Sequence, residues 1–323
     1  TTGGTNNASV SFEPRAWRIG ESVLRRSMIA EQYGERGPVL LVVAAIHGNE
    51  RPAVTFAERW RVMLQGGLAQ RTGTRIVFVP WANPDGIAAS SRENANDIDL
   101  NRNFPAENFE PGGPGGDTPL SEPESQALRM VIDAVEPSAV ISVHCCVPTF
   151  DYDGPARELA LSMAAAMDED IRYPVVRLGS YNGSMGSYVG VELGLPIITL
   201  EFQNDSIDTE EQLQNVEAAM TAAAEWAADK GQPADIVIAD ALAEAPSAEF
   251  ESFIYGRSAG GLPLRGDDML AGEQRVLVLA GVNDNDRRAL NAVEHIRRVL
   301  LSEIADVGVP LSIVTAANPD GIQ

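Results

Sequence analysis

Two histidines and a glutamate lie where metal-binding side chains are expected, at the ends of apolar segments. His47 and Glu50 follow the apolar run 39–45, which predicts a buried strand of a parallel sheet. His144 follows a second apolar run, 139–143. Because the carboxyl ends of parallel strands meet at one edge of a sheet, these three side chains can converge on one cation. Two imidazoles and one carboxylate leave a fourth tetrahedral position for water, so the pattern predicts a hydrolytic zinc site.

The remaining histidine and the two cysteines are interpreted as structural residues. His295 lies in the middle of an expected helix and is predicted to be a solvated or core residue. Cys145 and Cys146 are neighbours, and adjacent cysteines rarely satisfy disulfide geometry. We therefore expect no disulfide and interpret the pair as small core residues, with a place in the substrate pocket as the alternative.

The elements that must position the metal ligands alternate between strands and helices. Strand 39–46, a helix ended by Gly66-Gly67 and strand 75–81 form a parallel crossover unit. Asn49 is expected to cap its helix, and Ser121 with Glu124 is expected to form a capping box. The fold class is therefore α/β, with a mixed, mostly parallel central sheet flanked by helices. The other expected elements are hairpin 19–28, helix 122–135, a helix near 155–167, a strand near 174–178, strand 196–201 and helix 208–229.

The end of the chain repeats its beginning. Gly256, Ser258 and Leu264 fall about 236 positions after Gly20, Ser22 and Met28, and Asn318-Pro319-Asp320-Gly321 repeats Asn83-Pro84-Asp85-Gly86. We therefore expect a catalytic domain over 1–231, a linker over 232–249 and a partial copy over 250–323, folded as hairpin, strand, helix and strand. The copy has no metal pair, because Asn283 and Asp286 replace His47 and Glu50. We expect it to pack against the catalytic domain or against a second chain, as a homo-oligomer.

The charge balance excludes several partners. The chain has 46 acidic and 24 basic residues, a formal net charge of -22. No basic cluster is available to neutralise phosphates, so we expect no nucleic acid and no anionic membrane as a partner. No apolar run reaches the roughly 18 residues of a membrane span. We expect a cytoplasmic location, with the periplasm or secretion as the alternative.

Six short motifs occur in a fixed order within residues 19–230. The motifs are His47-x-x-Glu50, Asn83-Pro84-Asp85-Gly86, Asp99-x-Asn101-Arg102-Asn103-Phe104-Pro105, Ser121-Glu122-Pro123-Glu124, Ser142-Val143-His144 and Thr199-Leu200-Glu201. In this order they resemble the zinc carboxypeptidase superfamily, which contains carboxypeptidase A. Further stretches, 49–52, 92–105 and 183–187, are most similar to its bacterial murein peptide amidase branch.

The resemblance implies a role for each polar residue of these motifs. One zinc ion per chain is held by the three ligands named above, Glu201 is the general base, and Arg92 stabilises the oxyanion. Asn101 and Arg102 bind a free carboxylate of the substrate. The implied reaction is hydrolysis of an amide bond beside that carboxylate in a small peptide. For the amidase branch, this is the γ-D-glutamyl-diaminopimelate bond of murein peptides, in cell-wall recycling.

Two positions depart from the pattern of the superfamily. Tyr181 is the nearest counterpart of the tyrosine that many members place before the glycine-rich loop, and we expect it to bind substrate, although its spacing is short. Met185 stands where carboxypeptidases specific for basic residues carry an acid. We therefore expect Met185 to bind substrate in a pocket that is not built for lysine or arginine.

Three other functions are consistent with the same residues. A general metallocarboxypeptidase and a deacylase of the succinylglutamate desuccinylase type would use the same metal chemistry. The complete 99–105 motif and the Asn83-Pro84-Asp85-Gly86 sequence favour a peptide substrate. A catalytically dead binding module is the third alternative, and the metal content of the purified protein would distinguish it.

Overall fold

The computed structural model describes residue 12, residues 14–179, 181–203 and 210–231, and four strands within residues 250–314. The chain divides into two compact units, residues 1–242 and 243–323. The boundary between them falls inside the segment 232–249.

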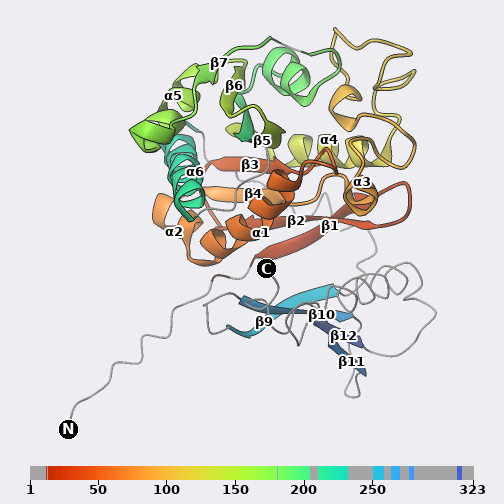
Figure 1. The fold of residues 1–323 in the computed structure, drawn as a ribbon, viewed down its shortest axis with the longest axis vertical. Coiled ribbons are helices and arrows are strands. Elements are labelled where there is room, and N and C mark those ends of the chain that lie inside the picture. The colour runs from red at the N-terminus through yellow and green to blue at the C-terminus, as the bar shows by residue number, and fades with distance from the viewer. Residues whose placement is uncertain are drawn as a thin grey trace. The chain divides into compact units, whose positions relative to one another are not determined.

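An eight-stranded sheet organises the first unit, in the order β1-β2-β4-β3-β5-β8-β6-β7 (Figure 1). Its central strands β4, β3, β5 and β8 run parallel, whereas β1, β2 and β6 add antiparallel pairs. The expected mixed, mostly parallel sheet is confirmed. The strands are β1 (Arg15–Glu21), β2 (Ser27–Tyr33), β3 (Val39–Ala44), β4 (Arg75–Val79), β5 (Ala139–Cys146), β6 (Thr149–Asp153), β7 (Val175–Val176) and β8 (Ile197–Gln203).

Helices cover both faces of this sheet. On one face, α1 (Arg51–Gln65), α2 (Leu68–Thr72), α5 (Arg157–Ala166) and α6 (Glu210–Lys230) contribute to one apolar core. On the other face, α4 (Pro123–Val135) packs with a second core. All six residues of β3 are buried, because successive side chains of a strand face opposite sides and both sides are covered here.

Short elements complete the first unit. They are α3 (Pro84–Ala89), η1 (Leu100–Arg102), η2 (Glu169–Ile171) and η3 (Ser187–Glu192). Among the described helices, none combines the length and the apolar character that crossing a membrane requires.

Both expected helix caps are wrong. The N-cap of α1 is Glu50, not Asn49, and no side chain caps that end. The N-cap of α4 is Glu122, also without a side-chain cap. Instead of closing a capping box, the Glu124 carboxylate accepts hydrogen bonds from the Val23 backbone N–H and from the Asn94 amide.

Other boundaries differ in extent. The Asn83-Pro84-Asp85-Gly86 motif forms the start of α3, where the Asn83 Oδ1 atom accepts a hydrogen bond from the Gly86 N–H. Strand β6 was not expected, and the strand expected near 174–178 is reduced to two residues. The glycine-rich segment 179–190 includes the start of η3.

The second unit contains a four-stranded sheet in the order β11-β12-β10-β9. Strands β9 and β10 are antiparallel, β10 and β12 are antiparallel, and β11 and β12 are parallel. Taken from β9 to β11, this is the order and relative direction of β1, β2, β4 and β3 in the first unit. The strands are β9 (Phe250–Arg257), β10 (Pro263–Met269), β11 (Val276–Leu279) and β12 (Leu311–Val314).

The pairing registers of the two sheets also coincide. Gly256 pairs with Leu264 beside a register shift, as Gly20 pairs with Met28. In the parallel pair, Val276 lies opposite Leu311 as Leu40 lies opposite Ile76. The helix expected in this unit, with Asn283, Asp286 and His295, lies outside the described residues.

Candidate metal centre and substrate site

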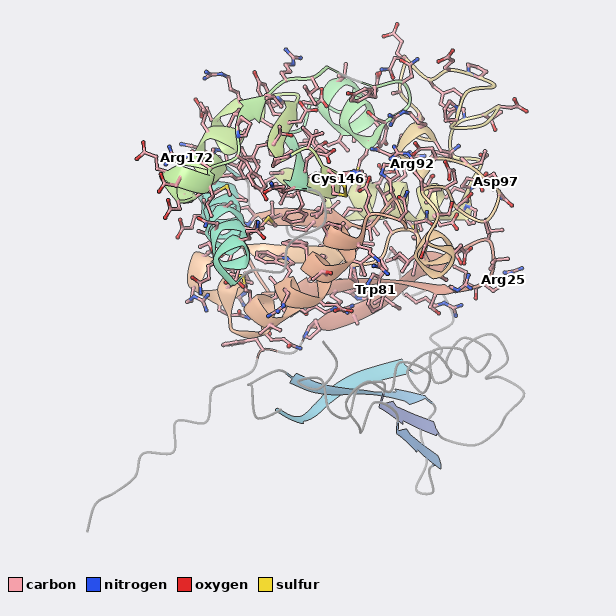
Figure 2. The ribbon with its side chains drawn as sticks, viewed as in Figure 1. Arg25, Trp81, Arg92, Asp97, Cys146 and Arg172 are labelled. Carbon is pink, nitrogen blue, oxygen red and sulfur yellow. A yellow bond between two sulfur atoms is a disulfide. The ribbon has the colours of Figure 1, made fainter. Side chains whose placement is uncertain are left out.

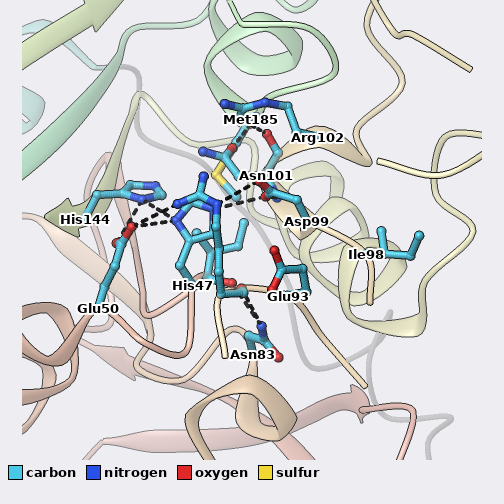
Figure 3. Close-up of polar contacts among 12 residues, drawn as sticks. His47, Glu50, Asn83, Glu93, Ile98, Asp99, Asn101, Arg102, His144 and Met185 are labelled. Carbon is cyan, nitrogen blue, oxygen red and sulfur yellow. Dashed lines mark hydrogen bonds and ion pairs between the residues drawn. The ribbon is translucent and has the colours of Figure 1, made fainter. Parts of the chain in front are cut away.

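The ends of β3 and β5 bring the three expected metal ligands together (Figure 3). His47 Nδ1 lies 2.7 Å from one carboxylate oxygen of Glu50, and His144 Nδ1 lies 3.2 Å from the other. The two Nδ1 atoms are 3.2 Å apart. One ligand atom from each residue lies within 4.8 Å of the others, and all three residues are buried.

The other nitrogen of each histidine is held by a hydrogen bond. His47 Nε2 lies 3.0 Å from Asp99 Oδ1, and His144 Nε2 lies 2.9 Å from Ser142 Oγ. Nε2 protons satisfy these contacts, and release of the Nδ1 protons that face Glu50 would free both Nδ1 lone pairs for a cation. Three electron-rich groups that share one buried point fit a divalent cation such as zinc.

Asp99 is the residue whose part in this arrangement the sequence did not reveal. Its carboxylate bridges two groups of the site, accepting from Arg92 Nε at 3.0 Å as well as contacting His47. The available signal was its place in the Asp99-x-Asn101-Arg102 motif, two residues from a predicted carboxylate-binding pair.

The protonation of the cluster follows from its contacts. Burial alone would raise the pKa of Glu50, but hydrogen bonds from His144 and His47 outweigh it and lower that pKa to about 2. Burial likewise opposes ionisation of Asp99, yet the contact with His47 and the charge of Arg92 hold its pKa below the usual range. Burial lowers the pKa of His144. Both carboxylates are therefore ionised and His144 is neutral at neutral pH, as metal ligation requires.

The turn that carries His47 is fixed by close backbone packing. A Cβ atom on Gly48 would lie 1.9 Å from the carbonyl carbon of Gly86, so only glycine fits there. The buried Asn83 amide donates to the Ile46 carbonyl at 3.2 Å and to the Arg92 carbonyl at 3.4 Å. One asparagine thus ties the His47 turn to the segment that carries Arg92.

Glu201 lies beside the metal ligands, on β8. It pairs directly with His144 in the parallel register of β5 and β8. Burial, reinforced by the negative charge of Glu50, raises the pKa of Glu201 to about 7. Within the described part of the chain, its Oε2 atom is buried without a hydrogen-bond partner. This carboxyl group can therefore exchange a proton near neutral pH.

The three other polar residues expected in the site lie around Asp99. Arg92 Nη1 lies 3.5 Å from Glu50 Oε1, and more than a third of the Arg92 side chain is exposed. Asn101 Oδ1 accepts a hydrogen bond from the backbone N–H of Met185 at 2.9 Å. The Arg102 guanidinium donates to the Asn101 carbonyl at 2.6 Å.

Tyr181 and Met185 differ in their access to this site. The Arg102 guanidinium carbon lies 5.0 Å from the centre of the Tyr181 ring, and Tyr181 is half exposed. Met185 is fully buried, and its side chain belongs to the apolar core around α4. Met185 therefore contacts Asn101 through its backbone.

The expectation of two unpaired core cysteines is wrong. Cys145 and Cys146 form a disulfide, and the peptide bond between them is cis. Cys146 is exposed at the end of β5 (Figure 2), because the strand leaves the core at this point. The Cys145 backbone N–H donates to Glu50 Oε2 at 3.1 Å, so this strand end also orients a metal ligand.

Comparisons with known proteins agree with this geometry. The family model of the succinylglutamate desuccinylase/aspartoacylase catalytic domain matches residues 36–226. Murein peptide amidase A of Escherichia coli strain K12 is 35% identical over 188 residues, which cover 52% of this chain and 72% of that protein. The Vibrio campbellii protein of the same name is 32% identical over 226 residues, covering 63% and 85%.

Solved structures of related proteins are also similar to this chain in three dimensions. The crystal structure of the murein-tripeptide amidase of Escherichia coli O157 superimposes with a TM-score of 0.54 at 28% identity, covering 69% of this chain and 98% of that one. The bovine thrombin-activatable fibrinolysis inhibitor reaches a TM-score of 0.55 at 18% identity, which supports the fold alone.

Proposed function

The chain belongs to the family of succinylglutamate desuccinylase/aspartoacylase catalytic domains and, with murein peptide amidase A, to the zinc carboxypeptidase superfamily, and from this we propose a zinc-dependent amidase of murein peptides. Its relatives are peptidases and amidases, so the chain is a hydrolase. The proposed bond is the γ-D-glutamyl-diaminopimelate amide, beside a free carboxylate. The observation that carries the proposal is the convergence of His47 Nδ1, His144 Nδ1 and the Glu50 carboxylate.

Each group beside this convergence has a task in amide hydrolysis. Zinc held by the two histidines and Glu50 would supply Lewis acidity and lower the pKa of water. Glu201, with a pKa of about 7, takes a proton from the attacking water. It then gives that proton to the leaving nitrogen as the carbon–nitrogen bond breaks.

Two arginines recognise the negative charges of the reaction. Arg92 faces Glu50 and Asp99 with more than a third of its side chain exposed, so it can stabilise the developing oxyanion. Asn101 and Arg102 bind the free carboxylate of the substrate, the latter through its planar fork of donors. Tyr181, over the Arg102 guanidinium, limits the orientations that this fork can adopt.

A deacylase remains the second candidate, because the matching family model includes desuccinylases. The two functions differ in what lies on the acyl side of the bond: a peptide in the amidase, a short diacid in the deacylase. The identity of more than 30% to murein peptide amidase A over most of that protein favours the peptide.

A cleavage screen tests the proposal. Purified zinc-loaded protein is incubated with murein tripeptide, with ordinary peptides ending in different residues and with N-succinylglutamate. Release of diaminopimelate from the tripeptide supports the proposal. Cleavage of ordinary peptides with an intact tripeptide makes the protein a general carboxypeptidase, and release of succinate alone makes it a deacylase.

We further propose that residues 250–323 are a partial copy of the beginning of the catalytic domain, without a metal site. The matching strand order and the matching pairing registers of the two sheets support this. The replacement of His47 and Glu50 by Asn283 and Asp286 supports the loss of the metal site.

A further inference from the structure

A cavity of about 340 Å³ lies beside the residues proposed to bind the substrate carboxylate. Two parts of the chain that are distant in the sequence form its wall: the end of η1 with the loop after it, and the segment before η3. This volume is at the lower end of the roughly 300–1,000 Å³ found for small-molecule sites. The lining residues are Arg102, Glu110, Pro114, Gly115, Tyr181 and Asn182.

Two opposite charges face this cavity without neutralising each other. The Arg102 guanidinium donates to the Asn101 carbonyl and lies against the Tyr181 ring. The Glu110 carboxylate accepts a hydrogen bond from the Asn182 amide at 2.9 Å. Neither charged group has an ion-pair partner within 4 Å among the described residues, although such pairs occur elsewhere in the first unit. Both charges therefore remain available to a ligand.

The backbone that carries these two charged residues is closely packed. A Cβ atom on Gly115 would lie 2.0 Å from the Arg102 carbonyl oxygen, and one on Gly183 would lie 2.2 Å from it. Two loops thus press on the Arg102 backbone from different parts of the chain. The Gly183 N–H also bonds to Asn108 Oδ1, which joins the Glu110 loop to the loop of Asn182. Close packing therefore fixes the backbone segments from which Arg102 and Glu110 project toward the cavity.

A ligand that satisfies both charges carries a carboxylate and an ammonium group. If Arg102 binds the free carboxylate beside the scissile amide, Glu110 faces the side chain of the residue that is released. Resting on the proposed function, we propose that Glu110 recognises an ammonium group on that side chain, so that the enzyme selects substrates that release a diamino acid. Pro114 supplies an apolar wall for the methylene groups between the two charges.

The source of this selectivity differs from the position examined in the sequence. Met185 offers no charge and is buried in the core. The acid comes instead from Glu110, on the loop that follows Asn101 and Arg102. Lysine and diaminopimelate both present the required ammonium group, whereas norleucine has the same chain length as lysine without it.

The test compares three substrates that share the γ-D-glutamyl group and release diaminopimelate, lysine or norleucine. Wild type is compared with Glu110→Gln, and Asp117→Asn is the control because Asp117 is an exposed acid of the same loop outside the cavity lining. In Glu110→Gln, the ratio of kcat/KM for the lysine substrate to that for the norleucine substrate should fall about two- to fivefold, as expected for a solvent-accessible ion pair. The ratio of kcat/KM for the diaminopimelate substrate to that for the norleucine substrate should fall similarly. Asp117→Asn should keep both ratios at their wild-type values.

A binding measurement separates this inference from the proposed function. Free lysine and free norleucine are titrated calorimetrically into wild type and Glu110→Gln, and lysine should lose the same factor in affinity while norleucine does not. If none of the three substrates is cleaved but this difference is found, the proposed function fails and the role of Glu110 stands. Equal lysine affinities in the two proteins, or unchanged kcat/KM ratios in Glu110→Gln, overturn the inference.

Discussion

Replacing Glu201 by glutamine should stabilise the metal-free protein at high pH. The same substitution should abolish most of the activity of the zinc-loaded protein. The Glu201 carboxyl is largely buried, and one of its oxygens has no hydrogen-bond partner in the described part of the chain. Its pKa of about 7 lies above the ordinary value of 4.5. The folded state therefore binds this proton more tightly than the unfolded state.

The sign and size of the effect follow from proton linkage. Below pH 4.5 the group is protonated in both states and has no effect on the unfolding free energy. Between pH 4.5 and 7 the unfolded state loses the proton first, so stability falls, and above pH 7 the full cost is present. A difference of about 2.5 between the two pKa values corresponds to an upper limit of about 3 kcal/mol. Partial solvent access reduces this, and we expect about 1–2 kcal/mol.

The assay is urea unfolding of metal-free wild type and Glu201→Gln at pH 5 and pH 8. All four tryptophans, Trp17, Trp60, Trp81 and Trp226, lie in the first unit, so their fluorescence reports on that unit. The variant should gain about 1–2 kcal/mol relative to wild type between pH 5 and pH 8. Any fixed cost of burying the glutamine amide cancels in this difference.

Two outcomes would refute this reasoning. A relative stability that does not change with pH would mean that the Glu201 carboxyl is not held in an unfavourable ionised state. If the zinc-loaded variant loses less than about a hundredfold in kcat, Glu201 is not the base of the reaction. Loss of zinc from the variant would make Glu201 a ligand and require a new role for Glu50.

Three further predictions concern the support of the site. Asp99→Asn should weaken zinc binding by about 10- to 100-fold, because His47 loses its charged orienting partner. Equilibrium dialysis measures the zinc affinity, and Asp97→Asn, a change at a nearby exposed acid, is the control that should leave this affinity unchanged. Asn83→Ala should lower the unfolding free energy by about 2 kcal/mol or more through lost hydrogen bonds, measured by urea unfolding, and an unchanged midpoint would contradict this. Deleting residues 246–323 should expose apolar surface, which dye binding or aggregation would detect. The truncated protein should still bind one zinc per chain, since all three expected ligands lie in the first unit. A reduced zinc content would contradict this second expectation.

The central strands and their ligands could be predicted because their signals are local. The run 39–45 is apolar at every position, which indicates a strand covered on both faces, and β3 has all six residues buried. His47 and His144 follow such runs directly. Since parallel strands end at a common edge, their convergence with Glu50 required no further information.

The features that sequence analysis missed depend on contacts between distant segments. Glu124 satisfies the capping-box pattern, but its carboxylate is taken by Val23 and Asn94, far away in the sequence. Asp99 contacts His47 across 52 positions, and no local pattern predicts this pair. Strand β6 alternates polar and apolar residues over only five positions and is recognised by its antiparallel pairing with β8.

The central claim is tested most directly by measuring bound zinc and diaminopimelate release on the same samples. The protein is stripped of metal, reloaded with zinc, and assayed with murein tripeptide, alongside His144→Ala treated identically. We predict one zinc per chain and release of diaminopimelate by wild type, with both lost in His144→Ala. A wild-type protein that binds no stoichiometric zinc, or that binds zinc and leaves the amide bond intact, would contradict the proposal.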